Sequence, residues 1–125
     1  MTPFASFTRQ TYLNLETFRK SGAGVRTPVW FVQTGDTIYI RTAANSGKVK
    51  RIRNNHQVNI APCKMNGDPL GEWLPALAAR VSDQETIRQV DRLLNKKYGL
   101  MKKLFGLASV LQHQEDAILE IKVKS

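Results

Sequence analysis

The 125-residue sequence contains a single cysteine, Cys63, and only two histidines, His56 and His113. A lone cysteine cannot form a disulfide bond within its chain, and these three side chains are too few for a structural metal cluster, so we expect no metal site. No apolar stretch approaches the roughly 20 residues that span a bilayer. The start, MTPFASFTRQ, lacks the basic and apolar segments of a secretory signal. These absences predict a cytoplasmic protein with no membrane partner.

Acidic residues are scarce as well: 10 Asp and Glu stand against 19 Lys and Arg, which gives a formal net charge of +9. Such a surplus favours an anionic partner, for example nucleic acid, a phosphate-bearing cofactor or an acidic lipid. The basic residues gather in two clusters, at 48–53 and at 96–103. The second cluster lies in a helical pattern, where a solvated face explains it. The first cluster follows a turn and is more informative.

The rest of the composition, 42% hydrophobic and 23% charged residues, is typical of a folded domain. A chain of this length buries roughly two thirds of its unfolded surface and needs no covalent cross-link to hold a core. No internal repeat or Pro/Gly-rich linker interrupts it. We therefore expect one domain over residues 1–125.

Alternating apolar and polar residues predict about six strands, which turn signals separate. The expected strands cover 11–19, 25–34, 37–42, 57–63, 71–81 and 117–124. Pro28 lacks an N–H group, so its strand belongs at an edge or an interruption of a sheet. Gly35 and Asp36 form the turn of a hairpin. Because helices do not alternate with these strands, the pattern favours a mainly β, antiparallel, closed or nearly closed barrel over a parallel α/β fold.

Two helical regions interrupt the strands. A short basic helix is predicted from Lys48 to Asn55, in which Val49 and Ile52 share a buried stripe. A helical pair is predicted before the last strand, with Ser82 as the N-cap of a capping box and with Gly99 ending its first helix.

The segment that leads into the basic helix has the features of a phosphate site. Thr42 and Ser46 offer hydroxyl groups, and Gly47 lets the backbone approach a ligand closely. The first N–H groups of a helix and its dipole attract an anion, to which Lys48 and Arg51 add full charges. An ordinary capped helix with a solvated basic face would show the same residues, and composition alone does not separate the two explanations.

The preceding strand offers a platform for a ring. Val29 and Phe31 project to one face of the strand and Trp30 to the other. Pro28 leaves a backbone group beside Thr27 free to meet the edge of a heteroaromatic ring. The alternative is that Trp30 and Phe31 are core residues, and their spacing alone favours that alternative.

The order RTPVWFV…TIYIRTAANSGKVKRIRNNHQVNIAPC…GDPLGEWLPALAARV resembles the split-barrel flavin and deazaflavin oxidoreductases, the relatives of pyridoxamine 5′-phosphate oxidase. The greatest similarity is to the subgroup assigned to the deazaflavin coenzyme F-420, and it extends over 12–123. The resemblance implies a six-stranded antiparallel split β-barrel that forms a homodimer. It also implies FMN or coenzyme F-420 in a groove at the subunit interface, and hydride transfer to or from a small conjugated substrate.

By position, the resemblance also implies a set of cofactor-binding residues. Residues 26–31 would line the ring system chiefly through their backbone, and Trp73 would approach the cofactor from the partner subunit. Arg41 departs from the subgroup, in which an uncharged residue is expected. The implied set is Arg26, Thr27, Pro28, Val29, Trp30, Phe31, Arg41, Thr42, Ser46, Gly47, Lys48, Arg51 and Trp73.

Two other functions remain open. The first is a basic nucleic-acid-binding barrel, in which the cluster at 48–53 contacts phosphates and Trp30 or Trp73 stacks on bases. An aromatic content of 8% without an interleaved basic and aromatic strand argues against it, so we expect no nucleic acid partner. The second is a cofactor carrier without turnover. In an enzyme of this kind the cofactor supplies the hydride chemistry, so we expect no catalytic side chain, and we expect Cys63 to be a core residue.

Overall fold

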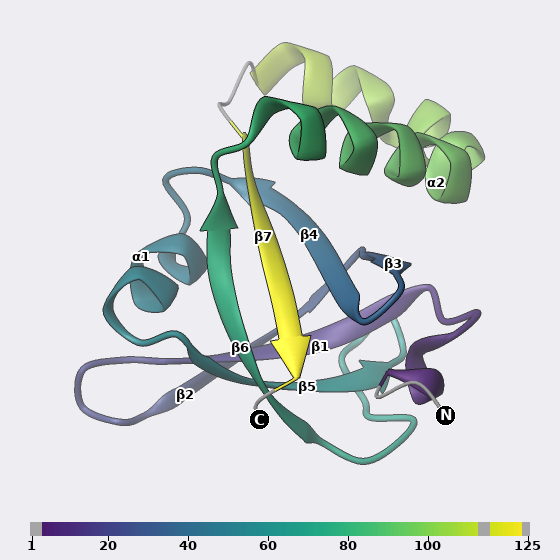
Figure 1. Ribbon diagram of the computed structural model, residues 1–125. Helices are drawn as coiled ribbons and strands as arrows, with labels where there is room; N and C mark the ends of the chain where they lie inside the picture. Colours follow the sequence, from purple (N-terminus) through teal and green to yellow (C-terminus); the bar gives the residue numbers. More distant parts are fainter. Residues whose placement is uncertain (1–3, 113–115, 124–125) are drawn as a thin grey trace.

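The computed structural model describes residues 4–112 and 116–123, and this part of the chain forms a curled β-sheet with two α-helices and a short 3-10 helix (Figure 1). The elements follow in the order η1 (Ala5–Phe7), β1 (Tyr12–Phe18), β2 (Gly24–Val29), β3 (Val32–Thr34), β4 (Thr37–Ala43), α1 (Gly47–Asn54), β5 (Gln57–Cys63), β6 (Leu74–Val81), α2 (Gln84–Gln112) and β7 (Asp116–Val123).

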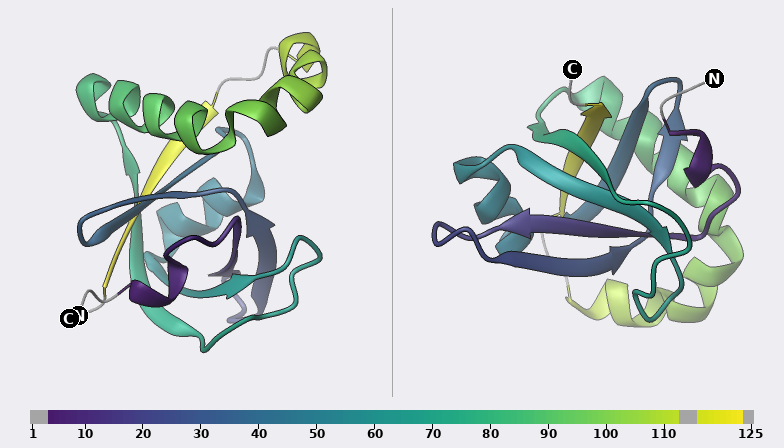
Figure 2. Two further views of the ribbon diagram at one scale, coloured as in Figure 1. Left: turned by 90° about the vertical axis from the view of Figure 1, so that its right-hand side faces the viewer. Right: turned by 90° about the horizontal axis from the view of Figure 1, so that it is seen from below.

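All strand pairs are antiparallel, and the strand order across the sheet is β2-β1-β5-β6-β7-β4-β3. The two edge strands, β2 and β3, are neighbours in sequence, joined only by Trp30 and Phe31. Because so short a connection links opposite edges, the sheet curls until its edges approach each other. Figures 1 and 2 show the result, in which β1, β2 and β5 cross the direction of β4, β6 and β7. The predicted mainly β, barrel-like class is confirmed.

The strand predicted at 25–34 is wrong in one respect, because it divides into β2 and β3 and makes seven strands instead of six among the described residues. A side chain stabilises the division. The hydroxyl of Tyr98 accepts a hydrogen bond from the Phe31 N–H at 3.1 Å and lies 2.9 Å from the Phe31 carbonyl oxygen. Both main-chain groups at the break are therefore satisfied without a neighbouring strand. Pro28 lies on the edge strand β2, as its missing N–H predicts.

Helix α1 confirms its prediction. Ser46 is the N-cap, its hydroxyl accepts from the Val49 N–H at 3.5 Å, and the Val49 and Ile52 side chains are buried. The N-cap of α2 is Asp83, which corrects the prediction of Ser82. Its carboxylate accepts hydrogen bonds from the N–H and the hydroxyl of Thr86, at 3.0 and 2.6 Å. A carboxylate is a strong cap for the positive end of a helix, and so the cap shifts by one residue.

The predicted helical pair is confirmed, because α2 consists of two helical segments that meet at a kink at Tyr98, which has φ −115° and ψ 16°. The break thus falls one residue before the predicted Gly99. α2 lies across the end of the sheet where β4, β6 and β7 meet it (Figure 1). None of the helices within residues 4–112 combines the length and the apolar character that a bilayer crossing requires.

Two apolar clusters fill the fold. The larger one, the barrel core, lies inside the curled sheet and contains buried residues such as Leu15, Ile40 and Leu119, together with Ile52 from α1. The smaller one, the α2 core, lies between the sheet and α2 and includes Val32, Leu94 and Tyr98. Cys63 is buried as predicted, and burial raises the pKa of its thiol, so it is a structural side chain and not a reactive one.

Candidate cofactor-binding site

The N-terminus of α1 is built around an arginine that folds back over a glycine. A Cβ atom added to Gly47 would lie 2.5 Å from Nη1 of Arg51, so the missing side chain makes room for the guanidinium at the start of the helix. Nε of Arg51 donates a hydrogen bond to the Thr17 hydroxyl at 2.6 Å, which fixes the side chain on β1. We call Thr17, Ser46, Gly47, Lys48 and Arg51 the α1 corner.

The charges of the α1 corner oppose the helix dipole. The first turn of α1 contains no acidic residue, while Lys48 and Arg51 place two cations at its positive end. Burial, and then the charge of Arg51, lower the pKa of Lys48. Burial, and then the charge of Arg19, lower the pKa of Arg51. Both side chains are half-buried, and in each case the neighbouring charge that contributes is another cation. A bound anion would relieve this repulsion.

A buried hydroxyl without a partner lies beside the α1 corner. The Thr27 Oγ1 atom is buried and makes no hydrogen bond with any described residue. In the register of β1 and β2, Leu15 is opposite Thr27 and Thr17 is opposite Val25. Residues opposite or two apart share a face of a sheet, so Thr27 lies on the same face as Thr17, roughly 7 Å along the strands. A ligand that extends from the α1 corner along β2 would supply the missing partner.

Arg26 and Trp73 come together on the other face of these strands. The Arg26 guanidinium lies 4.6 Å from the centre of the Trp73 ring, and its Nε donates to Oε2 of Glu16 at 2.8 Å. Asn59 also donates to Glu16, at 2.9 Å, and this hydrogen bond is the main cause that lowers the Glu16 pKa, with Arg26 adding to it. The side chains of residues 26–29 therefore alternate between the two faces of the sheet, and the implied lining through the backbone stays a prediction. Arg26 and Pro28 are exposed on the outer face of the sheet, whereas Thr27 and Val29 lie on the inner face.

The side chains of Trp30 and Phe31 take part in packing. Trp30 stacks on Tyr98 with 4.5 Å between ring centres and an angle of 4°. Phe31 is buried in the barrel core, edge to face with Phe7. The Phe31 carbonyl also accepts a hydrogen bond from Lys97 at 2.9 Å. The side chains of Trp30 and Phe31 are thus core residues, which is the alternative that their spacing favoured over a platform for a ring.

Arg41 has carboxylate partners that hold it outside the α1 corner. Its guanidinium pairs with Asp116 at 2.6 Å and with Asp91 at 3.1 Å, which ties β4 to β7 and α2. Thr42 follows it and points to the opposite face, close to the turn in which the Ser46 N–H donates to the Ala43 carbonyl at 3.0 Å. The structure thus brings Thr42 near the α1 corner and directs Arg41 away from it.

Sequence reasoning missed two residues of this region. Thr17 orients Arg51, and the only signal for it was its position on the apolar face of the first strand, after Leu13 and Leu15. Tyr98 holds the junction of β2 and β3, and no pattern distinguished it from the other tyrosines. Within residues 4–112 and 116–123, no three His, Cys, Asp or Glu side chains gather as metal ligands.

Comparison with known proteins identifies the fold. No protein-family model matches the chain, and no curated protein matches it either. Solved structures do match. The heme storage protein HutZ from Vibrio cholerae superposes with a TM-score of 0.71 at 18% sequence identity, covering 94% of this chain and 84% of HutZ. A Listeria innocua protein provisionally assigned as a pyridoxamine 5′-phosphate oxidase gives 0.68 at 12% identity, covering 97% and 90%.

An F420 reductase gives a TM-score of 0.62 at 17% identity, covering 96% of this chain and 91% of the reductase. The chain therefore has the split-barrel fold of the pyridoxamine 5′-phosphate oxidase-like proteins. The fold expected from the sequence resemblance is confirmed, with one strand more than expected.

Proposed function

We propose that this protein binds the phosphate of FMN or of the deazaflavin coenzyme F-420 at the α1 corner and works as an oxidoreductase. The observation that carries the proposal is the pair of desolvated cations, Lys48 and Arg51, at the start of a helix without an acidic residue in its first turn. The unpaired Thr27 hydroxyl on the same sheet face supports a ligand that continues along β2. The residues present therefore fit a phosphate-bearing planar cofactor.

Each residue of the corner has a defined part in this proposal. Lys48 supplies a point charge, and Arg51, held by Thr17, offers a planar guanidinium that matches phosphate geometry. The N–H groups of Gly47 and Lys48 begin the helix and have no acceptor within it, so they are available to phosphate oxygens. The Thr27 hydroxyl donates to, or accepts from, a polar atom at the edge of the ring.

The bound cofactor would supply two-electron, hydride-transfer chemistry with a small conjugated substrate. The chain's own part is to bind, orient and desolvate it. The solved structures that share the fold support a ring cofactor of this type, since they include an F420 reductase and an FAD-binding protein from Mesorhizobium loti. They also include a heme storage protein, so the class of cofactor has to be measured.

We also propose that the protein is a homodimer whose interface includes the outer face of β1, β2 and β5. Trp73 is half-buried there against Arg26, next to the loop that carries the exposed apolar side chains of Met65 and Leu70. A second copy would cover these exposed apolar side chains. Sedimentation equilibrium tests this part: a mass of twice 14.1 kDa is expected, and a monomer at all concentrations would contradict it.

Binding of FMN and of coenzyme F-420, followed by the quenching of their fluorescence, tests the proposed site. Lys48→Ala is expected to weaken the preferred cofactor by about 1–3 kcal/mol, the range for a charge-assisted hydrogen bond. Lys50→Ala is the matched control, because Lys50 is exposed on the same helix and carries the same charge. If both variants lose the same cofactor affinity, the loss reflects only the net charge of the protein. That result would contradict a phosphate site at Lys48.

The same titration separates the other functions. Steeply salt-dependent binding of DNA without binding of either cofactor would favour the nucleic-acid-binding barrel. Binding of heme alone would favour a heme protein. A cofactor that binds but is never reduced or reoxidised by any substrate would favour a carrier.

A further inference from the structure

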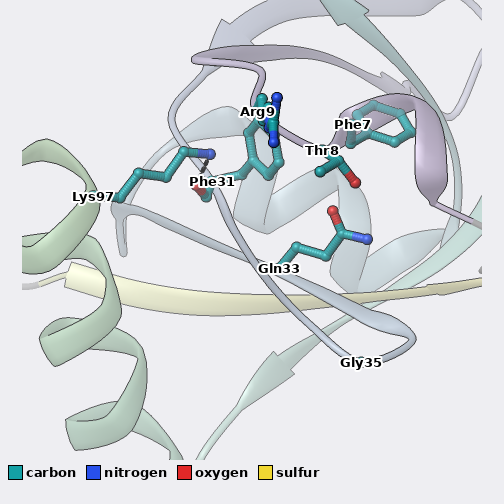
Figure 3. Close-up of a pocket in the computed structure, with 7 residues that line it drawn as sticks. All are labelled: Phe7, Thr8, Arg9, Phe31, Gln33, Gly35 and Lys97. Atoms are coloured by element: carbon teal, nitrogen blue, oxygen red, sulfur yellow. Dashed lines mark hydrogen bonds between the residues drawn. The ribbon is translucent and has the colours of Figure 1, made fainter.

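A cavity lies far from the α1 corner. It has a volume of about 490 Å³ and opens between the N-terminal segment, the β3–β4 turn at Gly35 and α2 (Figure 3). Its walls are Phe7, Thr8, Arg9, Phe31, Gln33 and Lys97. Gly35 precedes β4 and Ser46 follows it, so the length of this strand separates the cavity from the α1 corner by roughly 20 Å. The volume is in the range of small-molecule sites.

The cavity is positively charged. Arg9 and Lys97 enter it from different parts of the chain, and none of the residues that line it is acidic. Neither side chain forms an ion pair within the part of the chain that the structure describes. Two cations that share a cavity without a carboxylate favour an anionic occupant.

The Lys97 ammonium is held in the cavity with donors to spare. Its Nζ donates to the Phe31 carbonyl at 2.9 Å and lies 3.6 Å from the centre of the Phe31 ring. An ammonium group has three N–H donors, and this hydrogen bond uses one of them. Partial burial of the ammonium lowers the Lys97 pKa to about 8. In Figure 3 the Lys97 side chain reaches from α2 to Phe31, and Arg9 lines the same cavity.

Arg9 has an unusual backbone. It is the one residue other than glycine with a positive φ among those described, at +67°. The left-handed conformation costs free energy for a side chain of this kind, and such strain gathers at functional sites. Here it falls in the turn where the Gln10 N–H donates to the Phe7 carbonyl at 3.1 Å. The turn holds Arg9 at the rim of the cavity.

The floor of the cavity belongs to the barrel core. The rings of Phe7 and Phe31 meet edge to face, 6.0 Å apart, and both are buried, so they hold the floor in place and leave the polar groups of the wall to contact a ligand. Gln33 anchors the N-terminal segment through a hydrogen bond from its Nε2 to the Phe4 carbonyl at 3.2 Å. The Thr8 hydroxyl adds a further polar group opposite Lys97 (Figure 3).

We propose that this cavity binds a small organic anion, whose carboxylate or phosphate contacts Lys97 and Arg9. This inference goes beyond the proposed cofactor site and does not depend on it, because the two sites share no charged residue.

The test uses three aromatic probes of similar size, benzoate, phenyl phosphate and the neutral benzamide, in NMR titrations of the cofactor-free protein. At least one anion is expected to bind ten times more tightly than benzamide and to shift the amide signals of Thr8, Gln33 and Lys97. The tighter of the two anions identifies the head group as carboxylate or phosphate. Equal affinities for all three probes, or shifts confined to α1, would overturn the proposal.

Variants assign the effect to the cavity. Lys97→Gln keeps an N–H donor but loses the charge, and it is expected to weaken the anion at least tenfold. Lys96→Gln is the matched control, because Lys96 is the exposed neighbour on the same helix and does not line the cavity. Equal affinities of the two variants would refute the role of Lys97. If Lys97→Gln does not fold, Arg9→Gln replaces it, because Arg9 is exposed at the rim of the cavity. Arg9→Gln is likewise expected to weaken binding of the anion.

Lys48→Ala separates this proposal from the proposed function. It removes a cation of the α1 corner and is expected to leave unchanged the affinities for benzoate and phenyl phosphate that are read from the amide signals of Thr8, Gln33 and Lys97. A failure of cofactor binding therefore does not affect the result. A loss of these shifts in Lys48→Ala would contradict the second site.

Discussion

Tyr98→Phe removes the one hydroxyl group that holds the junction between β2 and β3. The hydroxyl contacts the Phe31 N–H at 3.1 Å, the Phe31 carbonyl at 2.9 Å and the Thr11 carbonyl at 2.7 Å. The Phe31 carbonyl keeps its hydrogen bond from Lys97, and water can replace the hydroxyl at the exposed Thr11. The buried Phe31 N–H has no substitute. We therefore expect a loss of about 1–3 kcal/mol in the free energy of unfolding, the cost of one unsatisfied buried donor.

Urea unfolding followed by tryptophan fluorescence measures this loss. Tyr39→Phe is the control, because Tyr39 is half-buried and its hydroxyl makes no hydrogen bond in the described part of the chain. Its change is expected to stay within about 0.5 kcal/mol. The Phe31 amide should also exchange its hydrogen faster in Tyr98→Phe. Equal losses in the two variants, with no change in that exchange, would refute the role of the hydroxyl.

Three further predictions concern single groups. Thr27→Val removes the unpaired hydroxyl, so in urea unfolding it should stabilise the cofactor-free protein by about 1 kcal/mol while weakening cofactor binding. Gly99→Ala should raise thermal stability, gaining about 0.5–1 kcal/mol, because an added Cβ meets nothing within 4 Å. Burial lowers the Lys97 pKa from 10.5 to about 8. The native state thus binds this proton less tightly than the unfolded state, and stability relative to Lys97→Gln should rise between pH 8 and 10.5, with the Lys97 ¹³Cε signal titrating near pH 8.

The sequence predicts the position of a strand correctly where residues adjacent in the chain determine where it begins and ends. β5 lies at the predicted 57–63, because its alternation and the turns on both sides are local signals. The hairpin of β3 and β4 followed from Gly35, which takes a positive φ of 57° at its turn. The break between β2 and β3 could not be read in this way. It depends on Tyr98, 67 residues further along the chain, and a local pattern carries no information on such a contact.

The candidate site was predictable in its residue types and not in its geometry. Ser46 as a cap, Lys48 in the first turn and Arg51 one turn further on follow from the sequence around α1. That Arg51 folds back over Gly47 depends on Thr17 in a distant strand. In the same way, the two carboxylates that pair with Arg41 come from α2 and β7. The position of Arg41 outside the α1 corner therefore could not be predicted without the tertiary structure.

A crystal structure of the protein with FMN or coenzyme F-420 tests the central claim most directly. We predict that the cofactor's phosphate lies at the N-terminus of α1, within hydrogen-bond distance of Lys48 and of the Arg51 guanidinium, and that a polar atom of the ring lies beside the Thr27 hydroxyl. A bound cofactor whose phosphate lies elsewhere, with the α1 corner filled only by solvent, would contradict the account.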